Sequence, residues 1–275
     1  MPTPTPTEYV LGTGADELER LGLQHRLWSD AAHAAWKLAR LTPGARVLDV
    51  GSGPGYAAFD LAQIVQRAGA VVAVDESQSF IEYVAEQARA RSLPQLVGRV
   101  GDVQRLDDIL AGERAFDLAY ARWVLCFVQS PDAVVAGVAR ALRPGGRFVV
   151  HDYFNYTSMT TAPRRESYAK IVQATGRSWR ARGGDPDIGG RLPRLLHECG
   201  FEIEHVTAHQ RLARPGDSMW PWVESWWRNF VPRLVALREI TDDDASIFFA
   251  DFESMRAETD FTVLPCVYEI VARKR

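Results

Sequence analysis

Alternating glycines end the first long apolar run of this sequence. Residues 47–50 read Val-Leu-Asp-Val, and Gly51-Ser-Gly-Pro-Gly55 follows them directly. A glycine turn between a strand and a helix lets the backbone approach a ligand closely, and open α/β sheets bind nucleotide-like ligands at such turns. The spacing G-x-G-x-G is shorter than the dinucleotide-binding pattern G-x-G-x-x-G. Gly51, Ser52 and Gly53 are therefore candidate ligand-binding residues.

Polar or charged residues also follow most of the later apolar runs. The run 70–74 is followed by an aspartate, at the separation from the glycine turn that suits an acid holding a ribose. The ends of parallel strands meet at one edge of a sheet, so these residues should enclose a common crevice. The candidates, in chain order, are Asp75, Asp102, Arg122, and His151 with Asp152.

The elements that position these residues alternate between strand and helix patterns. Apolar runs at 47–50, 70–74, 96–100, 116–121 and 147–150 predict five strands. Helical patterns separate them, and the sequence Leu142-Arg-Pro-Gly-Gly146 stops the helix before the fifth strand. The chain is therefore predicted to form an α/β, Rossmann-like, mostly parallel sheet.

These motifs, in this order, resemble a class I S-adenosylmethionine (SAM) methyltransferase. The likeness is greatest to the group containing the ubiquinone and menaquinone biosynthesis methyltransferases, and it covers about residues 40–153 and a C-terminal pair of strands. The resemblance implies SAM as the cofactor. It also implies a seven-stranded sheet whose last strand, expected at residues 262–272, runs antiparallel to the others.

The resemblance assigns roles at the ribose end of the cofactor. Backbone groups of Gly51, Ser52 and Gly53 would contact the methionine portion and the ribose, and Asp75 would accept hydrogen bonds from the ribose hydroxyls, with Glu76 beside it. The alternative for Asp75 is that it caps a helix at a strand–helix turn.

The resemblance also assigns the adenine and methionine ends. Asp102 would accept from the adenine amino group, while the Val103 amide would donate to a ring nitrogen. Ala121 and Arg122 would face the methionine moiety. Helix capping is the alternative for Asp102, and a structural salt bridge is the alternative for Arg122.

The N-terminal region predicts a helical cap over the cofactor. Residues 1–14 are rich in proline and threonine and predict a disordered leader, while residues 15–44 carry an amphipathic pattern of one or two helices. Four polar residues of these segments are candidates to reach the amino-acid end of SAM, and the alternative is that they are solvated or cap helices. They are Tyr9, Arg20, Gln24 and His25.

Two segments inserted in the SAM-binding domain, which spans residues 45–275, predict a helical lid. They occupy about residues 156–190 and 214–260. In the second, Trp222, Trp226 and Phe230 recur at i, i+4 and i+8 and so share one helix face. That face packs against the body of the protein, lines an apolar substrate pocket, or does both.

The candidates for a catalytic base are His151 and Asp152, at the end of the fifth strand. An imidazole there could accept a proton near neutral pH, but one of two adjacent strand residues points away from a shared site. His25 is a weaker candidate for the catalytic base. Tyr153 and Tyr156 follow and are candidates to orient the substrate.

Composition limits the classes of partner. The 275-residue chain has a net charge of −3 and a pI near 6.1, which argues against a broad nucleic-acid or acidic-membrane surface. Its three cysteines are widely spaced, as in a reducing cytoplasm, and no apolar run suits a membrane span. We expect a cytoplasmic protein with a small-molecule substrate and without a metal cluster; a homodimer stays open.

The acceptor class is the least determined feature. The fourth strand lacks the Asn/Asp-Pro-Pro-Tyr motif of amine methylation on nucleic-acid bases or glutamine. A small, partly apolar or aromatic metabolite is favoured, with O-methylation ahead of N- or C-methylation. The alternatives are a non-catalytic module that binds SAM or S-adenosylhomocysteine and, on the glycine turn alone, an NAD-dependent oxidoreductase.

Overall fold

A seven-stranded sheet forms the body of the protein, as the sequence predicts. The structure is a computed structural model that describes residues 14–257 and 260–275. The strand order is β3-β2-β1-β4-β5-β10-β7, and β10 runs antiparallel to both of its neighbours. The strands are β1 (Arg46–Val50), β2 (Ala70–Asp75), β3 (Leu96–Val100), β4 (Phe116–Arg122), β5 (Leu142–Tyr153), β7 (Phe201–His209) and β10 (Val267–Lys274).

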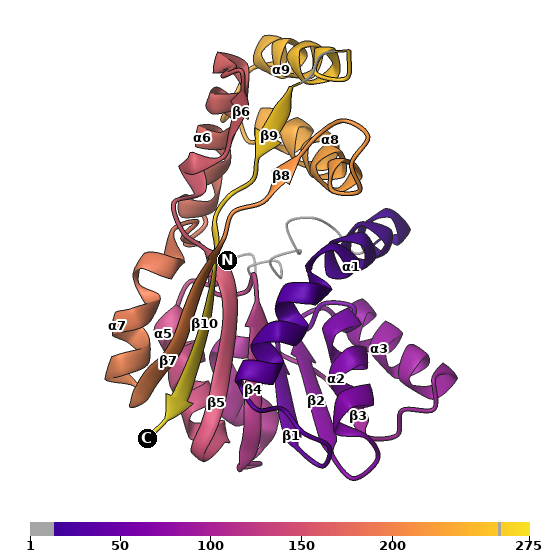
Figure 1. Cartoon of the computed structure of the whole chain (residues 1–275), viewed down its shortest axis with the longest axis vertical. Coiled ribbons are helices and arrows are strands. Elements are labelled where there is room, and N and C mark those ends of the chain that lie inside the picture. The colour runs from indigo at the N-terminus through magenta and orange to yellow at the C-terminus, as the bar shows by residue number, and fades with distance from the viewer. Residues whose placement is uncertain (1–13, 258–259) are drawn as a thin grey trace, which may run out of the picture.

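Helices cover both faces of this sheet (Figure 1). One layer contains α1 (Ala15–Leu38), α2 (Tyr56–Val65) and α3 (Gln78–Ala90). The other contains α4 (Leu106–Leu110), α5 (Pro131–Ala141) and α7 (Leu192–Glu198), with the short helices η1 (Val103–Arg105) and η3 (Ile188–Gly190) nearby. Because both faces are buried, the central strands read as almost continuous apolar runs.

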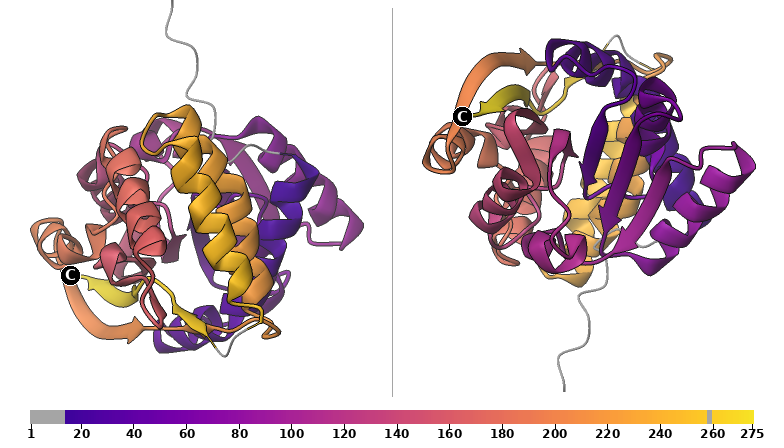
Figure 2. Two further views of the ribbon diagram at one scale, coloured as in Figure 1. Left: turned by 90° about the horizontal axis from the view of Figure 1, so that it is seen from above. Right: turned by 90° about the horizontal axis from the view of Figure 1, so that it is seen from below.

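Two inserted segments form a lid beyond the end of the sheet (Figures 1 and 2). The first contains η2 (Tyr156–Ser158), β6 (Thr160–Ala162) and α6 (Glu166–Arg180). The second contains β8 (Leu212–Ala213), α8 (Trp220–Ala236), α9 (Asp242–Ser254) and β9 (Phe261–Val263). We call residues 156–180, 212–257 and 260–263 the lid.

The lid contains a small sheet that the sequence pattern does not predict. Its strand order is β6-β9-β8, all antiparallel. The prediction of one last strand at 262–272 is therefore wrong in one respect. This stretch divides into β9 in the lid and β10 in the main sheet. Pro265, which cannot donate a backbone hydrogen bond, lies in the break.

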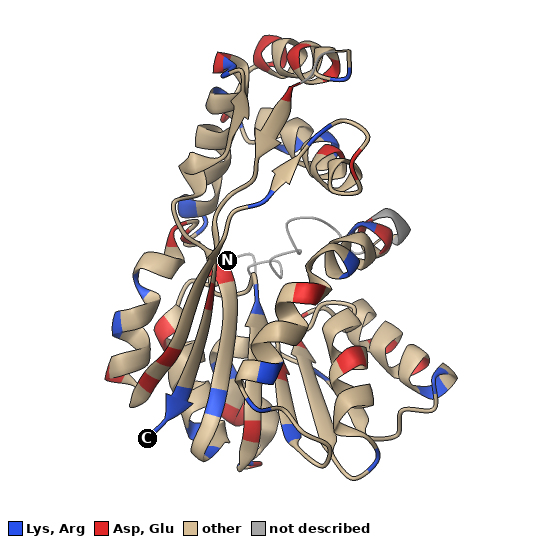
Figure 3. Cartoon of the chain, in the orientation of Figure 1, with Lys and Arg blue, Asp and Glu red and all other residues tan. Residues whose placement is uncertain are grey.

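The N-terminal region forms one continuous helix, α1, from Ala15 to Leu38. Residues 1–13 of the predicted leader lie outside the described residues. No helix within residues 14–257 and 260–275 combines the length and apolarity needed to cross a bilayer. Acidic and basic residues are interspersed along the body and the lid (Figure 3).

Candidate functional site

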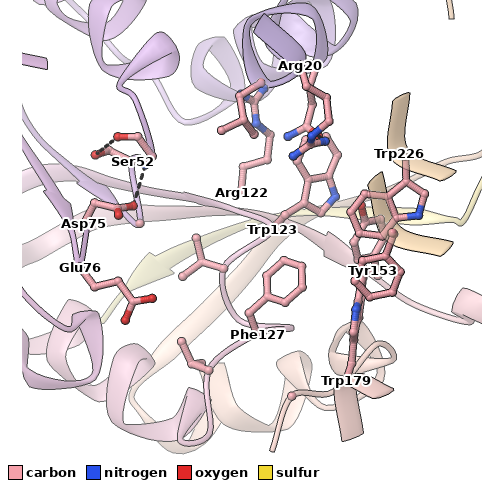
Figure 4. A pocket seen from close by; sticks show the side chains of 18 of the residues that line it. Arg20, Ser52, Asp75, Glu76, Arg122, Trp123, Phe127, Tyr153, Trp179 and Trp226 are labelled. Atoms are coloured by element: carbon pink, nitrogen blue, oxygen red, sulfur yellow. Dashed lines mark hydrogen bonds between the residues drawn. The ribbon is translucent and has the colours of Figure 1, made fainter. Parts of the chain in front are cut away.

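A cavity of about 1090 Å³ lies between the end of the sheet, α1 and the lid. Figure 4 shows its two unlike sides, with Asp75 and Glu76 on one and Trp123, Tyr153, Trp179 and Trp226 on the other. We call these sides the acidic half and the aromatic half. The volume slightly exceeds the usual range for one small ligand, about 300–1,000 Å³, so the cavity has room for a cofactor and an acceptor together.

The glycine turn forms the floor of the acidic half. All three glycines have positive φ, at +67° for Gly51, +54° for Gly53 and +81° for Gly55. A Cβ on Gly51 would lie 2.5 Å from a methyl of Val124, whereas one on Gly53 would meet nothing within 4 Å. Gly51 is thus required for packing, while Gly53 leaves open space beside the cavity.

Asp75 closes the glycine turn from the neighbouring strand. Its Oδ2 accepts from the Gly53 amide at 2.8 Å, and its Oδ1 accepts from the Ser77 amide at 2.9 Å. A carboxylate oxygen has two acceptor positions, so each oxygen keeps one for a ligand. Burial raises the pKa of Asp75. Glu76 also lines the cavity, and burial together with the charges of Asp75 and Asp102 raises its pKa.

Asp102 and Val103 line the next part of the wall. The Asp102 carboxylate caps η1, because Oδ1 accepts from the Gln104 amide at 2.9 Å and from its side-chain nitrogen at 3.0 Å. The capping alternative therefore describes its contacts in this structure. Its adenine role stays a prediction, as does that of Val103.

Asp49, which the sequence pattern did not mark as a site residue, also belongs to this half. It lines the cavity, is 2% exposed, and its Oδ2 has no hydrogen-bond partner among the described residues. Burial raises its pKa to about 7, although the nearby Arg122 acts to lower it. The sequence did contain a signal, since a carboxylate inside a buried strand, two positions before Gly51, needs a partner.

Arg122 separates the two halves. One terminal nitrogen lies 3.0 Å from His25 Nδ1, the other has no partner among the described residues, and the guanidinium carbon lies 5.3 Å from the Trp123 ring centroid. His25 is held by Asp60 at 3.0 Å and does not line the cavity. Ala121, also predicted as a site residue, is not part of the lining and packs in the core.

Two predicted residues of α1 reach the cavity. Arg20 lines it while paired with Glu17, with Nη2 2.6 Å from Oε1. Gln24 also lines it, and its Oε1 accepts from the Trp222 indole at 3.0 Å, which ties α1 to α8. Tyr9 lies outside the described residues.

The aromatic half is built from β4, β5 and the lid. Trp123 has a positive φ of +53°, an unusual conformation for a large residue, and its ring stacks on Tyr153 at 5.9 Å. Tyr153 packs edge-on against Tyr156 at 5.4 Å, and Trp179 lies 4.9 Å from Tyr156. Both tyrosines are candidates from the sequence, whereas the sequence pattern marks neither Trp123 nor Trp179 as part of the pocket.

The lid helix α8 completes this half. Trp222, Trp226 and Phe230 all line the cavity, as the i, i+4, i+8 pattern suggested. Trp226 stacks on Phe230 with ring centroids 4.8 Å apart. Trp222 and Phe230 are also buried in the core. The same helix face therefore packs against the body of the protein and lines the cavity.

His151 does not line the cavity. It is 1% exposed, and its Nε2 lies 3.0 Å from Oε2 of Glu269 on β10. Burial lowers the pKa of His151, and this effect outweighs the opposing effect of Glu269. The geometry favours a role away from the reacting atoms, because the side chain faces the neighbouring strand rather than the crevice.

Asp152 is likewise absent from the cavity wall. Its Oδ2 accepts from the Leu125 and Cys126 amides at 2.9 and 3.2 Å, and its Oδ1 accepts from its neighbour Tyr153 at 2.9 Å. Burial raises its pKa to about 6. The bonds to Leu125 and Cys126 hold the loop after β4 that carries Trp123.

We expect Asp152→Asn to destabilise the fold rather than the chemistry. Both carboxylate oxygens of Asp152 accept from backbone N–H groups, so the NH₂ of the substituted side chain must face one of these donors. Each buried donor left unsatisfied lowers the free energy of unfolding by about 1–3 kcal/mol. Thermal unfolding should show Tm lower by roughly 5–15 °C, while kcat per folded molecule stays within threefold. Asp108→Asn, on the surface, is the control. An unchanged Tm with lost turnover would instead support the predicted catalytic role.

Comparisons with known proteins agree with this geometry. Residues 41–196 match the model of a methyltransferase domain family. A demethylmenaquinone methyltransferase of Mycobacterium tuberculosis is 29% identical over 215 residues, which are 78% of this chain and 80% of that protein. The YcgJ protein of Bacillus subtilis has the same fold, with a TM-score of 0.58 at 14% identity over 89% of this chain and 99% of that one.

Another relative is longer than this chain. An uncharacterized 37.1 kDa protein in transposon TN4556 of Streptomyces fradiae is 30% identical over 223 residues, or 76% of this chain. The match spans 60% of that relative, which is less than two thirds of its length.

Proposed function

On the premise that this chain belongs to the methyltransferase domain family, we propose that it methylates a small, partly apolar or aromatic metabolite. The chain is a SAM-dependent methyltransferase, with SAM as its cofactor. The observation that carries the choice of acceptor is the aromatic half of the cavity, which lies opposite the acidic half.

The acidic half fits the cofactor. Gly53 leaves room beside the cavity, and both oxygens of Asp75 keep an acceptor position for the ribose hydroxyls. The unpaired Oδ2 of Asp49 suits the methionine ammonium, because a buried carboxylate is stabilised by a cationic partner. Bound SAM supplies a sulfonium-activated methyl group.

The aromatic half fits a flat, apolar acceptor. Among the described residues that line it, none is a carboxylate or a histidine. Trp123, Tyr153 and Trp226 offer extended ring surfaces, which bind flat molecules through apolar contact and stacking. One relative is named for demethylmenaquinone, a name in keeping with such an acceptor.

The same lining bears on how the acceptor is activated. Burial holds the pKa of Tyr153 and Tyr156 well above the usual value, so neither phenol accepts a proton near pH 7. The protein's contribution is then to align the acceptor with the methyl group and to exclude water. An acceptor that ionises by itself, such as an acidic phenol or a carboxylic acid, needs no base. This favours O-methylation.

We expect Trp226→Ala to weaken acceptor binding selectively. Removing the ring exposes apolar surface worth about 1.5–3 kcal/mol, so KM for the acceptor should rise roughly 10- to 100-fold. The dissociation constant of SAM should stay within threefold, because the residue lies in the aromatic half. Ile247→Ala on α9, an exposed position, is the control. Equal losses for both ligands would contradict the division into halves.

A labelled-methyl screen tests the function itself. The purified protein is incubated with methyl-labelled SAM and a metabolite extract, and labelled products are identified by mass spectrometry. We expect a labelled aryl ether or ester that disappears with Asp75→Ala. A labelled amine or ring carbon would overturn O-methylation. Binding of SAM without any labelled product would support the non-catalytic alternative.

A further inference from the structure

Three side chains from three adjacent strands converge at the β7 edge of the main sheet. They are His151 of β5, Glu269 of β10 and His209 of β7, which we call the His-Glu-His cluster. Glu269 Oε2 lies 3.0 Å from His151 Nε2 and 2.9 Å from His209 Nε2. Each residue has one nitrogen or carboxylate oxygen that could bind a metal ion, and these three atoms lie within 4.8 Å of one another.

The strand register produces this convergence. Glu269 is paired with His151 on one side and with Thr207 on the other. Since side chains two residues apart share a face, His209 lies on the same face as Thr207 and reaches Glu269 diagonally. Rigid sheet positions, rather than mobile loops, therefore fix the three groups.

We propose that the His-Glu-His cluster is a binding site for a divalent transition-metal ion, with Zn²⁺ the best match. Two imidazole nitrogens and one carboxylate form a known zinc ligand set, usually completed by water. At bonds of about 2.0–2.1 Å, neighbouring ligand atoms in a tetrahedron lie about 3.3–3.4 Å apart. The two separations between Glu269 and the histidines need to widen by only a few tenths of an ångström. The ligand atoms of the two histidines lie within 4.8 Å of each other and need to approach by at most about 1.4 Å.

The surroundings suit a bound ion with one open position. Glu269 and His151 are almost fully buried, whereas the side chain of His209 is 22% exposed and that of the adjacent His205 is 37% exposed. Solvent therefore reaches the cluster from the β7 edge. His205 Nε2 lies 3.7 Å from Glu269 Oε1 and adds a further imidazole beside the site.

The tautomers available to His151 also allow it to coordinate a metal ion through Nε2. Nε2 now lies within hydrogen-bond distance of Glu269, while Nδ1 is buried without a partner among the described residues. When Nε2 binds an ion, the imidazole stays neutral by carrying its proton on Nδ1. Tyr120 packs edge-on against this ring at 5.8 Å, and its hydroxyl is also unpaired within the described chain.

The cluster is separate from the cofactor and acceptor cavity. None of its three residues lines that cavity. A bound ion would join β5, β10 and β7, and its role would be to stabilise this edge of the sheet. The inference therefore does not depend on the proposed acceptor, and it is tested by metal binding alone.

The test is a metal titration of the full chain after chelator dialysis. We expect isothermal titration with ZnCl₂ to give one equivalent bound, and Co²⁺ to give the visible absorption of a tetrahedral site. His209→Ala and Glu269→Gln should each weaken Zn²⁺ binding by about 100-fold or more, since loss of an outer-shell partner alone costs 10–100-fold. His197→Ala, which removes an exposed histidine elsewhere, should leave the affinity unchanged.

Two results would overturn the proposal. One is a folded wild-type chain, checked by circular dichroism, that binds neither Zn²⁺ nor Co²⁺ stoichiometrically. The other is stoichiometric binding that His209→Ala and Glu269→Gln do not weaken, which would place the ion elsewhere. In either case the cluster is a hydrogen-bonded group only, with both imidazoles donating to one carboxylate. Glu269→Gln keeps the size of the side chain and guards against misfolding as the cause of lost binding.

Discussion

Asp75→Ala is expected to weaken SAM binding by roughly 100- to 1,000-fold. Hydrogen bonds to a charged group contribute about 1.5–3 kcal/mol each, and two ribose hydroxyls would lose their acceptor together. The Gly53 amide would also lose the bond that fixes the glycine turn. Isothermal titration with SAM and with S-adenosylhomocysteine measures the loss, and circular dichroism checks the fold.

Two further variants sharpen this experiment. Asp75→Asn keeps one oxygen for a backbone amide and removes the charge, so its affinity should fall between those of wild type and Asp75→Ala. Glu76→Gln, at the next position on the cavity wall, should change affinity less than fivefold. Wild-type affinity in Asp75→Ala would refute the ribose assignment and leave Asp75 a turn-forming residue only.

SAM affinity is expected to fall as the pH is lowered through 7, and Asp49 is the expected cause. Burial raises the pKa of this carboxyl to about 7, so below that pH it carries a proton that a cationic ligand must displace. Affinity should then decrease roughly tenfold per pH unit between pH 6 and pH 5. Above pH 8 the carboxylate is ionised and the affinity should be constant.

Asp49→Asn should remove most of this pH dependence. It should also lower affinity at pH 8 by about 100-fold or more, because breaking a buried ion pair costs roughly 3–5 kcal/mol. Asp75 and Glu76 also lie in the acidic half, and burial raises the pKa of each. A full pH slope that persists in Asp49→Asn would assign the titration to Asp75 or Glu76 instead, and Asp75→Asn and Glu76→Gln would separate these two.

The features that were predictable from the sequence are local ones. The glycine turn and Asp75 stand directly after apolar runs, and Asp102 stands one glycine after another. Parallel strands bring such positions to one edge. Helical spacing at i, i+4 and i+8 predicts that one helix face carries Trp222, Trp226 and Phe230. In each case a short stretch of chain contains both the element and the residue that it positions.

The features that escaped prediction depend on partners far apart in the chain. His151 and Glu269 are separated by 118 residues, so the register of β5 with β10, not a motif, brings them together. The Asp152 carboxylate is bound by backbone amides of the loop after β4. That loop has no periodic sequence pattern from which these bonds could be predicted. The lid sheet joins strands of two or three residues, which are too short to show alternation.

Each strand of the lid sheet is continuous in the chain with a strand of the main sheet. Residues 154–155, 210–211 and 264–266 link β5, β7 and β10 to the lid, and the Leu264 amide donates to the Arg211 carbonyl at 2.9 Å across two of them. The acidic half lies entirely outside the lid. The lid is joined to the body at four places, the fourth being residues 181–187 between α6 and η3, so exchanging it between homologues requires four junctions and leaves the acidic half of the recipient unchanged.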